Sequence, residues 1–305
     1  MGKSKKNCIF VSKKDMKNLL FPLCTIVLLL MACQTKQQTE QQIEQQTDEK
    51  IGKQTELDNI DGVCHFDFQN FELWTLRDVK SRMSADLFPD VDSNLLHRLM
   101  PKGDAESAIN VFLIRMNDQY ILFDAGLGTE SGGALLDNLA SIHLTPEDID
   151  VICITHCHRD HIGGLMARDT AVFPKAELWL SAPELEAFWQ DENVKKLQKA
   201  YNSRIHPFMF GDTIAGSVET FDASGHTPGH TVYKVGELYV IGDLIHAAIL
   251  QIPHPEYCAI YDKDPEKAVE TRKHFYQILE NPDVYAAGMH LPYSGVMKNF
   301  SIMND

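Results

Sequence analysis

The sequence has 305 residues, 44% of them hydrophobic and 9% aromatic, which is enough apolar material to bury a sizeable core. The formal net charge at pH 7 is −15, and because residues 1–33 contain six lysines and one aspartate, the rest of the chain is more acidic still. Such an acidic surface repels phosphate backbones, so we expect no nucleic-acid partner.

The first 33 residues are typical of an export signal. Basic residues up to Lys17 precede the apolar run LLFPLCTIVLLLMA (19–32), which is shorter than the roughly 20 residues of a membrane-spanning helix. The run ends in LMAC, which resembles a bacterial lipobox and implies cleavage before Cys33 and lipidation of its thiol. We therefore expect an exported protein, lipid-anchored at Cys33 to a bacterial membrane on the periplasmic or cell-surface side. An uncleaved anchor is the alternative.

A low-complexity segment follows at residues 34–59. QQTE, QQIE and QQTD repeat a Gln-Gln-x-acid unit among very few apolar residues, so the segment builds no core and we interpret it as a tether. We expect residues 60–305 to form one domain. The sequence leaves open whether translation starts at Met1 or at Met16.

Strands and helices are mixed along this domain. A hydroxyl or carboxylate before proline and an acid predicts helix starts at Thr145, Ser181 and Asp264, the last helix ending near Asn281. Elements without regular βαβ alternation fit an α/β sandwich of two sheets covered by helices. Apolar, β-branched runs predict strands at 64–76 (interrupted), 109–115, 120–123, 151–154, 177–180, 218–221, 231–235 and 238–241.

The stretch THCHRDHIGG (155–164) concentrates three histidines and an aspartate at the carboxyl end of a predicted strand. His156 and His158, two apart on an extended chain, point to the same side. His161 can swing back if a helical turn opens at Asp160. Neutral imidazoles and a carboxylate that converge in this way suit a borderline cation such as zinc. The alternative is a polar loop that is rich in histidine by chance.

Three further predicted strands end in donors of the same kind. SVETFDA leads into SGHTPGH (224–230), ELYVI leads into Gly242-Asp243, and VYAAGM leads into His290. A single histidine after a strand is more often a packed core residue than a ligand. Four strand ends that each deliver a donor indicate one metal centre.

As a set, THCHRDH, SGHTPGH, GD and the late His290 resemble the motifs of the metallo-β-lactamase fold superfamily, over about 245 residues from near Gly62 onwards. The resemblance implies a four-layer αββα sandwich. It implies that His230 lies behind the ligands or faces the substrate, and that Asp124 supports the site from behind. It implies two metals, the first held by His156, His158 and His226, the second by Asp160, His161 and His290, with Asp243 bridging them.

The implied chemistry is hydrolysis. Two cations roughly 3.5–4 Å apart can share a water, lower its pKa to about 7 and polarise a carbonyl or phosphoryl oxygen. We expect two Zn²⁺ per chain, with manganese, iron or cobalt as alternatives. Asp160 would orient the hydroxide. His246, three residues after Asp243, would donate to a departing oxygen or hold the substrate, unless it is an ordinary loop histidine.

Two longer segments narrow the resemblance within the superfamily. Residues 242–275 and GMHLPYSG (288–295) resemble the branch that contains methyl-parathion hydrolase and esterase- or lactonase-like enzymes, which implies a small-molecule ester, lactone or phosphotriester as substrate. His246 replaces a tyrosine found in some homoserine-lactone lactonases, so a signal lactone is not favoured. The set of glutathione-binding residues of glyoxalase II is missing from the sequence.

Other readings of the same motifs stay open. A mononuclear iron oxidoreductase resembling persulfide dioxygenases would use the same first histidines. A β-lactamase and a noncatalytic binding lipoprotein are further alternatives, and a homodimer is left open.

The cysteines and the aromatic segments complete the predictions. We predict no disulfide among Cys64, Cys153, Cys157 and Cys258, and we interpret Cys157 as a packing residue whose side chain points away from the metals. Two segments, 83–100 and 188–210, either cap an apolar substrate or pack as ordinary helices. Their candidate capping residues are Phe88, Trp189, Tyr201 and Phe208.

Overall fold

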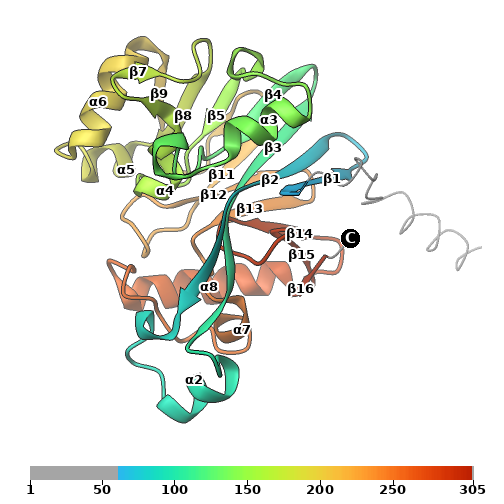
Figure 1. The fold of residues 1–305 in the computed structure, drawn as a ribbon, viewed down its shortest axis with the longest axis vertical. Helices are drawn as coiled ribbons and strands as arrows, with labels where there is room; N and C mark the ends of the chain where they lie inside the picture. Colours follow the sequence, from blue (N-terminus) through green and yellow to red (C-terminus); the bar gives the residue numbers. More distant parts are fainter. Residues whose placement is uncertain (1–60, 304–305) are drawn as a thin grey trace, which may run out of the picture. The chain divides into compact units, whose positions relative to one another are not determined.

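The computed structural model describes residues 61–303, which Figure 1 shows as a ribbon coloured along the sequence. The expected signal peptide, the lipidation site Cys33 and the tether at 34–59 lie outside the described residues. Within residues 61–303, no helix is both long enough and apolar enough to cross a membrane.

The first sheet has seven strands in the order β1-β2-β3-β4-β5-β8-β9. Strands β1 to β4 pair antiparallel, whereas β4, β5, β8 and β9 pair parallel. The interrupted strand predicted at 64–76 is two strands, and the second of these runs on to Ser84 in a long pairing with β3. The bounds are β1 Val63–Asp67, β2 Glu72–Ser84, β3 Asp104–Met116, β4 Gln119–Phe123, β5 Val151–Cys153, β8 Glu177–Ser181 and β9 Ile205–Phe208.

The second sheet also has seven strands, in the order β10-β11-β12-β13-β14-β15-β16. Only β13 and β14 pair parallel within it. A small separate pair, β6 Met166–Ala167 and β7 Thr170–Ala171, lies outside both sheets. The bounds are β10 Thr213–Ile214, β11 Val218–Asp222, β12 Thr231–Val235, β13 Leu238–Gly242, β14 Tyr285–Gly288, β15 Val296–Lys298 and β16 Ser301–Ile302.

Two of the three predicted helix starts open α-helices. The Ser181 hydroxyl accepts from the Glu184 amide at the start of α5, and the Asp264 carboxylate accepts from the Lys267 amide at the start of α8. Thr145 caps only a single 3₁₀ turn, because the chain is already extended again at Ile149. The α-helices are α2 Ser93–Leu99, α3 Leu135–Ser141, α4 Arg159–Ile162, α5 Ala182–Ala187, α6 Glu192–Tyr201, α7 Ala248–Gln251 and α8 Pro265–Leu279; the 3₁₀ turns are η1 Ala85–Leu87, η2 Thr129–Ser131, η3 Pro146–Asp148, η4 Gly163–Leu165 and η5 Asn202–Arg204.

Helices cover the outer faces of the two sheets. Leu113 and Ile152 of the first sheet share a buried apolar cluster with Leu139 of α3 and Leu197 of α6. On the other side, the second sheet packs against α8 in its own cluster. Between the sheets, the ring of Tyr233 lies 5.6 Å from that of Phe123. This arrangement confirms the predicted αββα sandwich.

The loops that leave the strand ends approach one another closely. The Ala125 amide donates to the His161 carbonyl at 2.7 Å, and the Gly164 amide donates to the Gly126 carbonyl at 3.2 Å. A Cβ on Gly163 would stand 2.3 Å from the Leu127 carbonyl oxygen, so only glycine leaves room for this backbone contact. The contact fixes α4, which carries part of the histidine motif, against the loop after β4.

Substituting Gly163 tests this close approach, because the contact predicts a lower stability where alanine would otherwise raise it. Gly163 has φ −61°, an ordinary helical angle at which alanine normally stabilises a protein by about 0.4–1 kcal/mol. We expect Gly163→Ala to lower the free energy of unfolding by about 1–3 kcal/mol instead, because the carbonyl of Leu127 cannot yield. Urea denaturation measures the change, and a more stable variant would contradict the packing.

The control for that experiment is Gly132→Ala. Its added methyl group meets nothing within 4 Å, while its φ of +89° is left-handed. It therefore measures backbone strain without a clash.

Candidate metal centre

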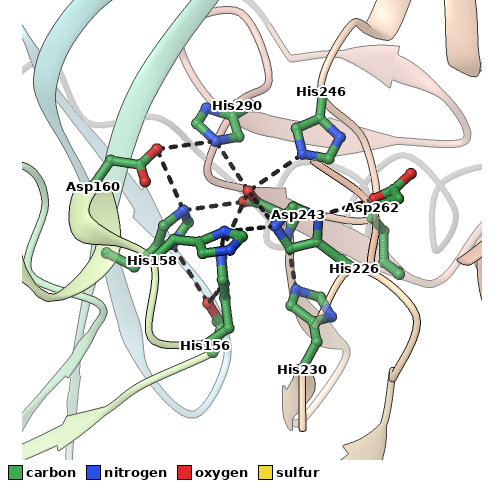
Figure 2. Close-up of polar contacts among 12 residues, drawn as sticks. His156, His158, Asp160, His226, His230, Asp243, His246, Asp262 and His290 are labelled. Carbon is green, nitrogen blue, oxygen red and sulfur yellow. Dashed lines mark hydrogen bonds and ion pairs between the residues drawn. The ribbon is translucent and has the colours of Figure 1, made fainter. Parts of the chain in front are cut away.

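The strand ends meet at one buried site, which Figure 2 shows in close-up. His156 and His158 follow β5, Asp160 and His161 lie on α4, and His226 lies in the loop between β11 and β12. Asp243 follows β13 and His290 follows β14. All seven residues that the sequence motifs single out as ligands are therefore brought together.

The first group of donors joins three imidazoles and a carboxylate. Nδ1 of His158 lies 3.0 Å from Nε2 of His156 and 3.0 Å from Nε2 of His226. Oδ2 of Asp243 lies 3.4 Å from Nε2 of His226 and 3.7 Å from Nε2 of His156. The four ligand atoms are all within 4.8 Å of one another, a spacing that fits a single cation.

The second group lies beside the first. Oδ2 of Asp160 is 3.6 Å from Nε2 of His161 and 3.4 Å from Nε2 of His290. Asp243 reaches this group too, because its Oδ1 is 3.3 Å from His161 and its Oδ2 is 3.1 Å from His290. One carboxylate thus lies between two sets of imidazoles.

The donor atoms cannot satisfy one another by hydrogen bonds, whereas a bound zinc ion would satisfy them. Nδ1 of His158 faces two imidazole nitrogens at hydrogen-bonding distance, and one nitrogen cannot satisfy both with a single proton. Nε2 of His161 and Oδ1 of Asp243 are buried and lie 3.3 Å apart, yet neither forms a well-aligned hydrogen bond within the described residues. Buried polar atoms without partners are costly, and a cation held by neutral imidazoles and carboxylates would satisfy them.

The electrostatics of the first group favour neutral ligands. Burial lowers the pKa of His158 to about 4, and burial likewise lowers the pKa of His226 to about 4. Both rings are therefore neutral at pH 7, which is the form that binds a metal.

The second group has the opposite bias. At His290, burial acts to lower the pKa, but the carboxylates of Asp243 and Asp160 outweigh it and raise the pKa to about 10. At Asp243, burial acts to raise the pKa, but the surrounding imidazoles, His161 first, hold it well below its usual range. The pocket is thus built around ionised carboxylates that attract positive charge.

Two residues lie behind the ligands. His230 is completely buried; its Nε2 accepts from the Asp243 amide at 2.9 Å, and its Nδ1 donates to the Ala223 carbonyl at 3.1 Å. Of the two positions that the resemblance allows for His230, these contacts correspond to the one behind the ligands, against the backbone of Asp243. Asp124 lies where the resemblance implies, with Oδ2 accepting from Nδ1 of His161 at 2.7 Å.

His246 lies inside the site, as the tight turn after Asp243 predicts. Its Nε2 is 3.4 Å from Oδ2 of Asp243, and its ring stacks on that of His290 at 5.5 Å. The side chain is buried, and neither ring nitrogen has a hydrogen-bond partner in the described residues.

Comparison with known proteins agrees with this geometry. Residues 105–276, over half of the chain, match the Metallo-beta-lactamase superfamily. The chain belongs to this superfamily. The crystal structure of the hydrolase AbOPH, of the beta lactamase superfamily, is 30% identical with a TM-score of 0.72, covering 79% of this chain and 94% of that one.

Two further similarities differ in extent. AidC, a dizinc quorum-quenching lactonase solved with N-hexanoyl-L-homoserine as product, is 26% identical with a TM-score of 0.71, covering 78% of this chain and 94% of that one. Exodeoxyribonuclease WalJ of Streptococcus pneumoniae is 38% identical over 110 residues, 35% of this chain. The match spans only 37% of the length of WalJ.

Sequence reasoning missed Glu184, an acidic residue that joins the loop after β5 to the loop between β11 and β12. The buried carboxylate of Glu184 accepts from the Cys157 amide at 2.7 Å, from the Gly229 amide at 2.9 Å and from the Thr227 hydroxyl at 2.7 Å. In the sequence, Glu184 reads as an acid in the first turn of α5. Its spacing from Ser181 gives no sign of a second role.

The sequence also missed Asp262 and Arg272. Asp262 lies in the loop before α8 and Arg272 lies on that helix. Oδ1 of Asp262 is 2.9 Å from Nδ1 of His226, and Oδ2 is 3.3 Å from Nη2 of Arg272. Neither residue belongs to a motif, so no signal in a single sequence could have found them.

The cysteines behave as predicted where the structure describes them. Cys153, Cys157 and Cys258 carry free thiols, and Cys157 packs in the apolar cluster of the first sheet. The Cys64 thiol donates to the Tyr293 hydroxyl at 3.0 Å.

Three of the four candidate capping aromatics pack in the core. Phe88, Tyr201 and Phe208 are buried, whereas 51% of Trp189 is exposed. Ordinary packing, the other reading of these segments, therefore holds for the first three.

Phe188, the first residue of the predicted capping segment 188–210, lines the rim of the site together with residues outside both segments. The ring of Phe188 lies 5.9 Å from that of His158, and the ring of Tyr261 lies 5.9 Å from that of His246. Ile260, beside Tyr261, is 58% exposed. The sequence-based capping hypothesis missed the loop that carries these last two residues.

The position of His230 predicts a loss of stability on substitution. His230→Ala removes the acceptor of the Asp243 amide and the donor to Ala223, so we expect a loss of about 1–3 kcal/mol in the free energy of unfolding at pH 7. His97→Ala, on the exposed face of α2, is the matched control and should change it by less than about 0.5 kcal/mol.

The loss should also depend on pH. Burial lowers the pKa of folded His230 to about 3, whereas an unfolded histidine titrates near 6.5. The wild type therefore loses the contribution of a neutral His230 as the pH falls from about 6.5 towards 3, and the variant has none to lose. Urea denaturation with chelator present should show the gap between the two proteins narrowing over that range. A gap that widens would contradict the assignment.

Proposed function

We propose that this protein is a metal-dependent hydrolase that holds two Zn²⁺ and cleaves an ester, lactone or phosphotriester bond of a small molecule. The observation that carries the proposal is the position of Asp243, whose carboxylate lies within 3.4 Å of His226 of one donor group and within 3.3 Å of His161 and His290 of the other. A single-metal oxidoreductase would need only one of these groups.

Three side chains in the pocket have roles that follow from their positions. Two zinc ions would supply an activated water at neutral pH and a Lewis acid for the scissile group. Asp160, with 29% of its side chain exposed, is reached by solvent and can orient the attacking water through a carboxylate oxygen. His246, whose ring nitrogens make no hydrogen bond within the described residues, can hold the substrate or give a proton to the departing oxygen. His230 only orients the Asp243 backbone.

The rim favours a partly apolar substrate. Phe188, Ile260 and Tyr261 lie beside the donors or close to them, and they offer apolar surface and one hydroxyl. The similarity to AidC supports a lactone within the proposed range of bonds. The partial similarity to an exodeoxyribonuclease supports DNA as a substrate instead, but the net charge of −15 disfavours DNA binding.

A substrate panel with a matched variant tests the proposal. We expect zinc-loaded wild type to hydrolyse at least one of an aryl ester, a lactone and a phosphotriester, and a chelator to abolish the turnover. Asp160→Ala should lower kcat at least 100-fold, because it removes both a metal ligand and the group that orients water. Asp118→Ala, at a carboxylate that is 98% exposed, is the control and should leave kcat unchanged.

Further arms of the same panel separate the alternatives. A β-lactam and single-stranded DNA stand for the other substrates found among similar folds. Metal analysis of the purified protein should give two zinc ions per chain. Chelator-insensitive turnover, full turnover by Asp160→Ala, or one iron per chain would each overturn the proposed mechanism.

We also propose that the protein is exported and anchored by a lipid at Cys33, although that residue lies outside the described part of the chain. The apolar run at 19–32 and the following LMAC support this. Cells fed a labelled fatty acid should incorporate the label into the wild type, because the Cys33 thiol is the acceptor. Cys33→Ser should take up no label, whereas Cys24→Ser, inside the apolar run, should stay labelled. An unlabelled wild type would contradict the anchor.

A further inference from the structure

A buried ion pair stands directly behind one of the metal-site histidines. The side chains of Asp262 and Arg272 are 0% and 1% exposed, and Nη2 of Arg272 lies 3.3 Å from Oδ2 of Asp262. The other carboxylate oxygen lies 2.9 Å from Nδ1 of His226. Figure 2 shows Asp262 on the far side of His226 from His156 and His158. A buried charge pair of this kind costs desolvation energy, so its position calls for a role.

The contacts of Asp262 fix the proton of His226. The ionised carboxylate only accepts, so Nδ1 of His226 must carry the hydrogen that it donates to Asp262. Nε2 is then left with a free lone pair, and it is this atom that lies 3.0 Å from Nδ1 of His158 and 3.4 Å from Oδ2 of Asp243. The tautomer and the direction of the ring are both those that a metal ligand needs.

The same residues do not form a third cation site. The donor atoms of His226, His246 and Asp262 lie close enough together to hold an ion. However, the guanidinium of Arg272 already neutralises Asp262, and the His226 nitrogen on that side is a donor. A further cation would meet a buried positive charge and a hydrogen, so this cluster orients His226 instead.

The other donor group has a counterpart with different partners. Asp124 accepts from Nδ1 of His161 at 2.7 Å, and its remaining contacts are the amide and hydroxyl of Thr155, both at 2.7 Å. Among the remaining ligand rings, Nδ1 of His156 lies 3.1 Å from the Thr155 hydroxyl and Nδ1 of His290 donates to the Ala108 carbonyl at 3.0 Å. Each donor group therefore has one imidazole backed by a buried carboxylate, and only the carboxylate behind His226 shares its charge with an arginine.

Arg272 also holds the loop that forms part of the rim. Its Nε donates to the Leu244 carbonyl at 2.6 Å, and its Nη1 donates to the carbonyls of Pro255 and Tyr257 at 2.9 and 3.0 Å. The amide of Lys263 in turn donates to the His226 carbonyl at 3.1 Å. One guanidinium therefore fixes the rim loop, the carboxylate and, through the carboxylate, the histidine.

We propose that Asp262, held by Arg272, is a positioning residue that sets the affinity of the zinc bound by His156, His158 and His226, without touching metal or substrate. The inference rests on the dinuclear function proposed above. Loss of the negative charge and of the fixed tautomer should weaken the binding of this zinc ion. The ion held by Asp160, His161 and His290 should stay bound. Hydrogen-bond partners of metal-bound histidines typically contribute 10–100-fold to metal affinity.

The test is a stepwise zinc titration of the full chain against a chromophoric chelator. We expect the wild type to bind two zinc ions. Asp262→Asn should bind one of them 10–100-fold more weakly, and its affinity for the other should stay within about threefold of the wild-type value. Asp124→Asn should lower the affinity for the other ion. The double variant, with both substitutions, should lower the affinity for both ions. Asparagine suits position 124, whose φ is +61°. Asp118→Asn, fully outside the site, is the control.

A second variant guards against misfolding. Arg272→Lys keeps the buried positive charge but loses bonds to the rim loop, so it should weaken the same ion as Asp262→Asn by a smaller factor. Suppose that the wild type binds two zinc ions. If both variants then bind the two ions as tightly as the wild type does, or if both variants lose the two ions to the same extent, the inference is wrong and the proposed function stands. Wild type that binds no zinc would overturn both.

Discussion

The fold depends on the cost of placing one carboxylate among five imidazoles away from water. Asp243 lies within 3.7 Å of the nitrogens of His156, His161, His226, His246 and His290, and only 3% of it is exposed. Taking a charge out of water costs several kcal/mol after relaxation, and such a cluster persists only if opposite charge and hydrogen bonds repay that cost. Cations among these donors would supply the charge, and the surrounding loops supply the hydrogen bonds.

The hydrogen bonds come mainly from buried acids that hold the loops in register. Glu184 binds both the loop of His158 and the loop of His226 through backbone amides. Asp124 fixes His161 and the Thr155 backbone together. Because these contacts are short, buried and multiple, the ligands are fixed by elements far apart in the sequence. A motif alone could not hold them, since its residues share no single helix or strand.

The motif histidines were predictable from the sequence because they follow apolar strand-like runs. Strands that run in the same direction end at the same edge of a sheet, so donors at four such strand ends could be expected to meet. The αββα layers came from the resemblance to a superfamily. In contrast, Asp262 and Arg272 meet His226 only through the packing of α8, and no local pattern distinguishes them from surface charges. His226 and His230 look alike in SGHTPGH; the resemblance made only His226 a ligand, and the buried contact with the Asp243 amide shows what His230 holds.

The rim was the least predictable part, for a related reason. Phe88, Tyr201 and Phe208 are apolar residues at helical or strand spacing, a pattern that core and cap share. Which of the two a residue joins depends on the neighbouring layer, and that information is not local.

The contacts of Arg272 separate the support of the metal donors from the identity of the rim side chains. Arg272 holds the rim loop through the carbonyls of Pro255 and Tyr257, which are backbone atoms. Such contacts do not depend on which side chains the loop presents, so Ile260 and Tyr261 can change without moving Asp262 or His226. The rim of this chain, more than the names of its relatives, should determine what it cleaves.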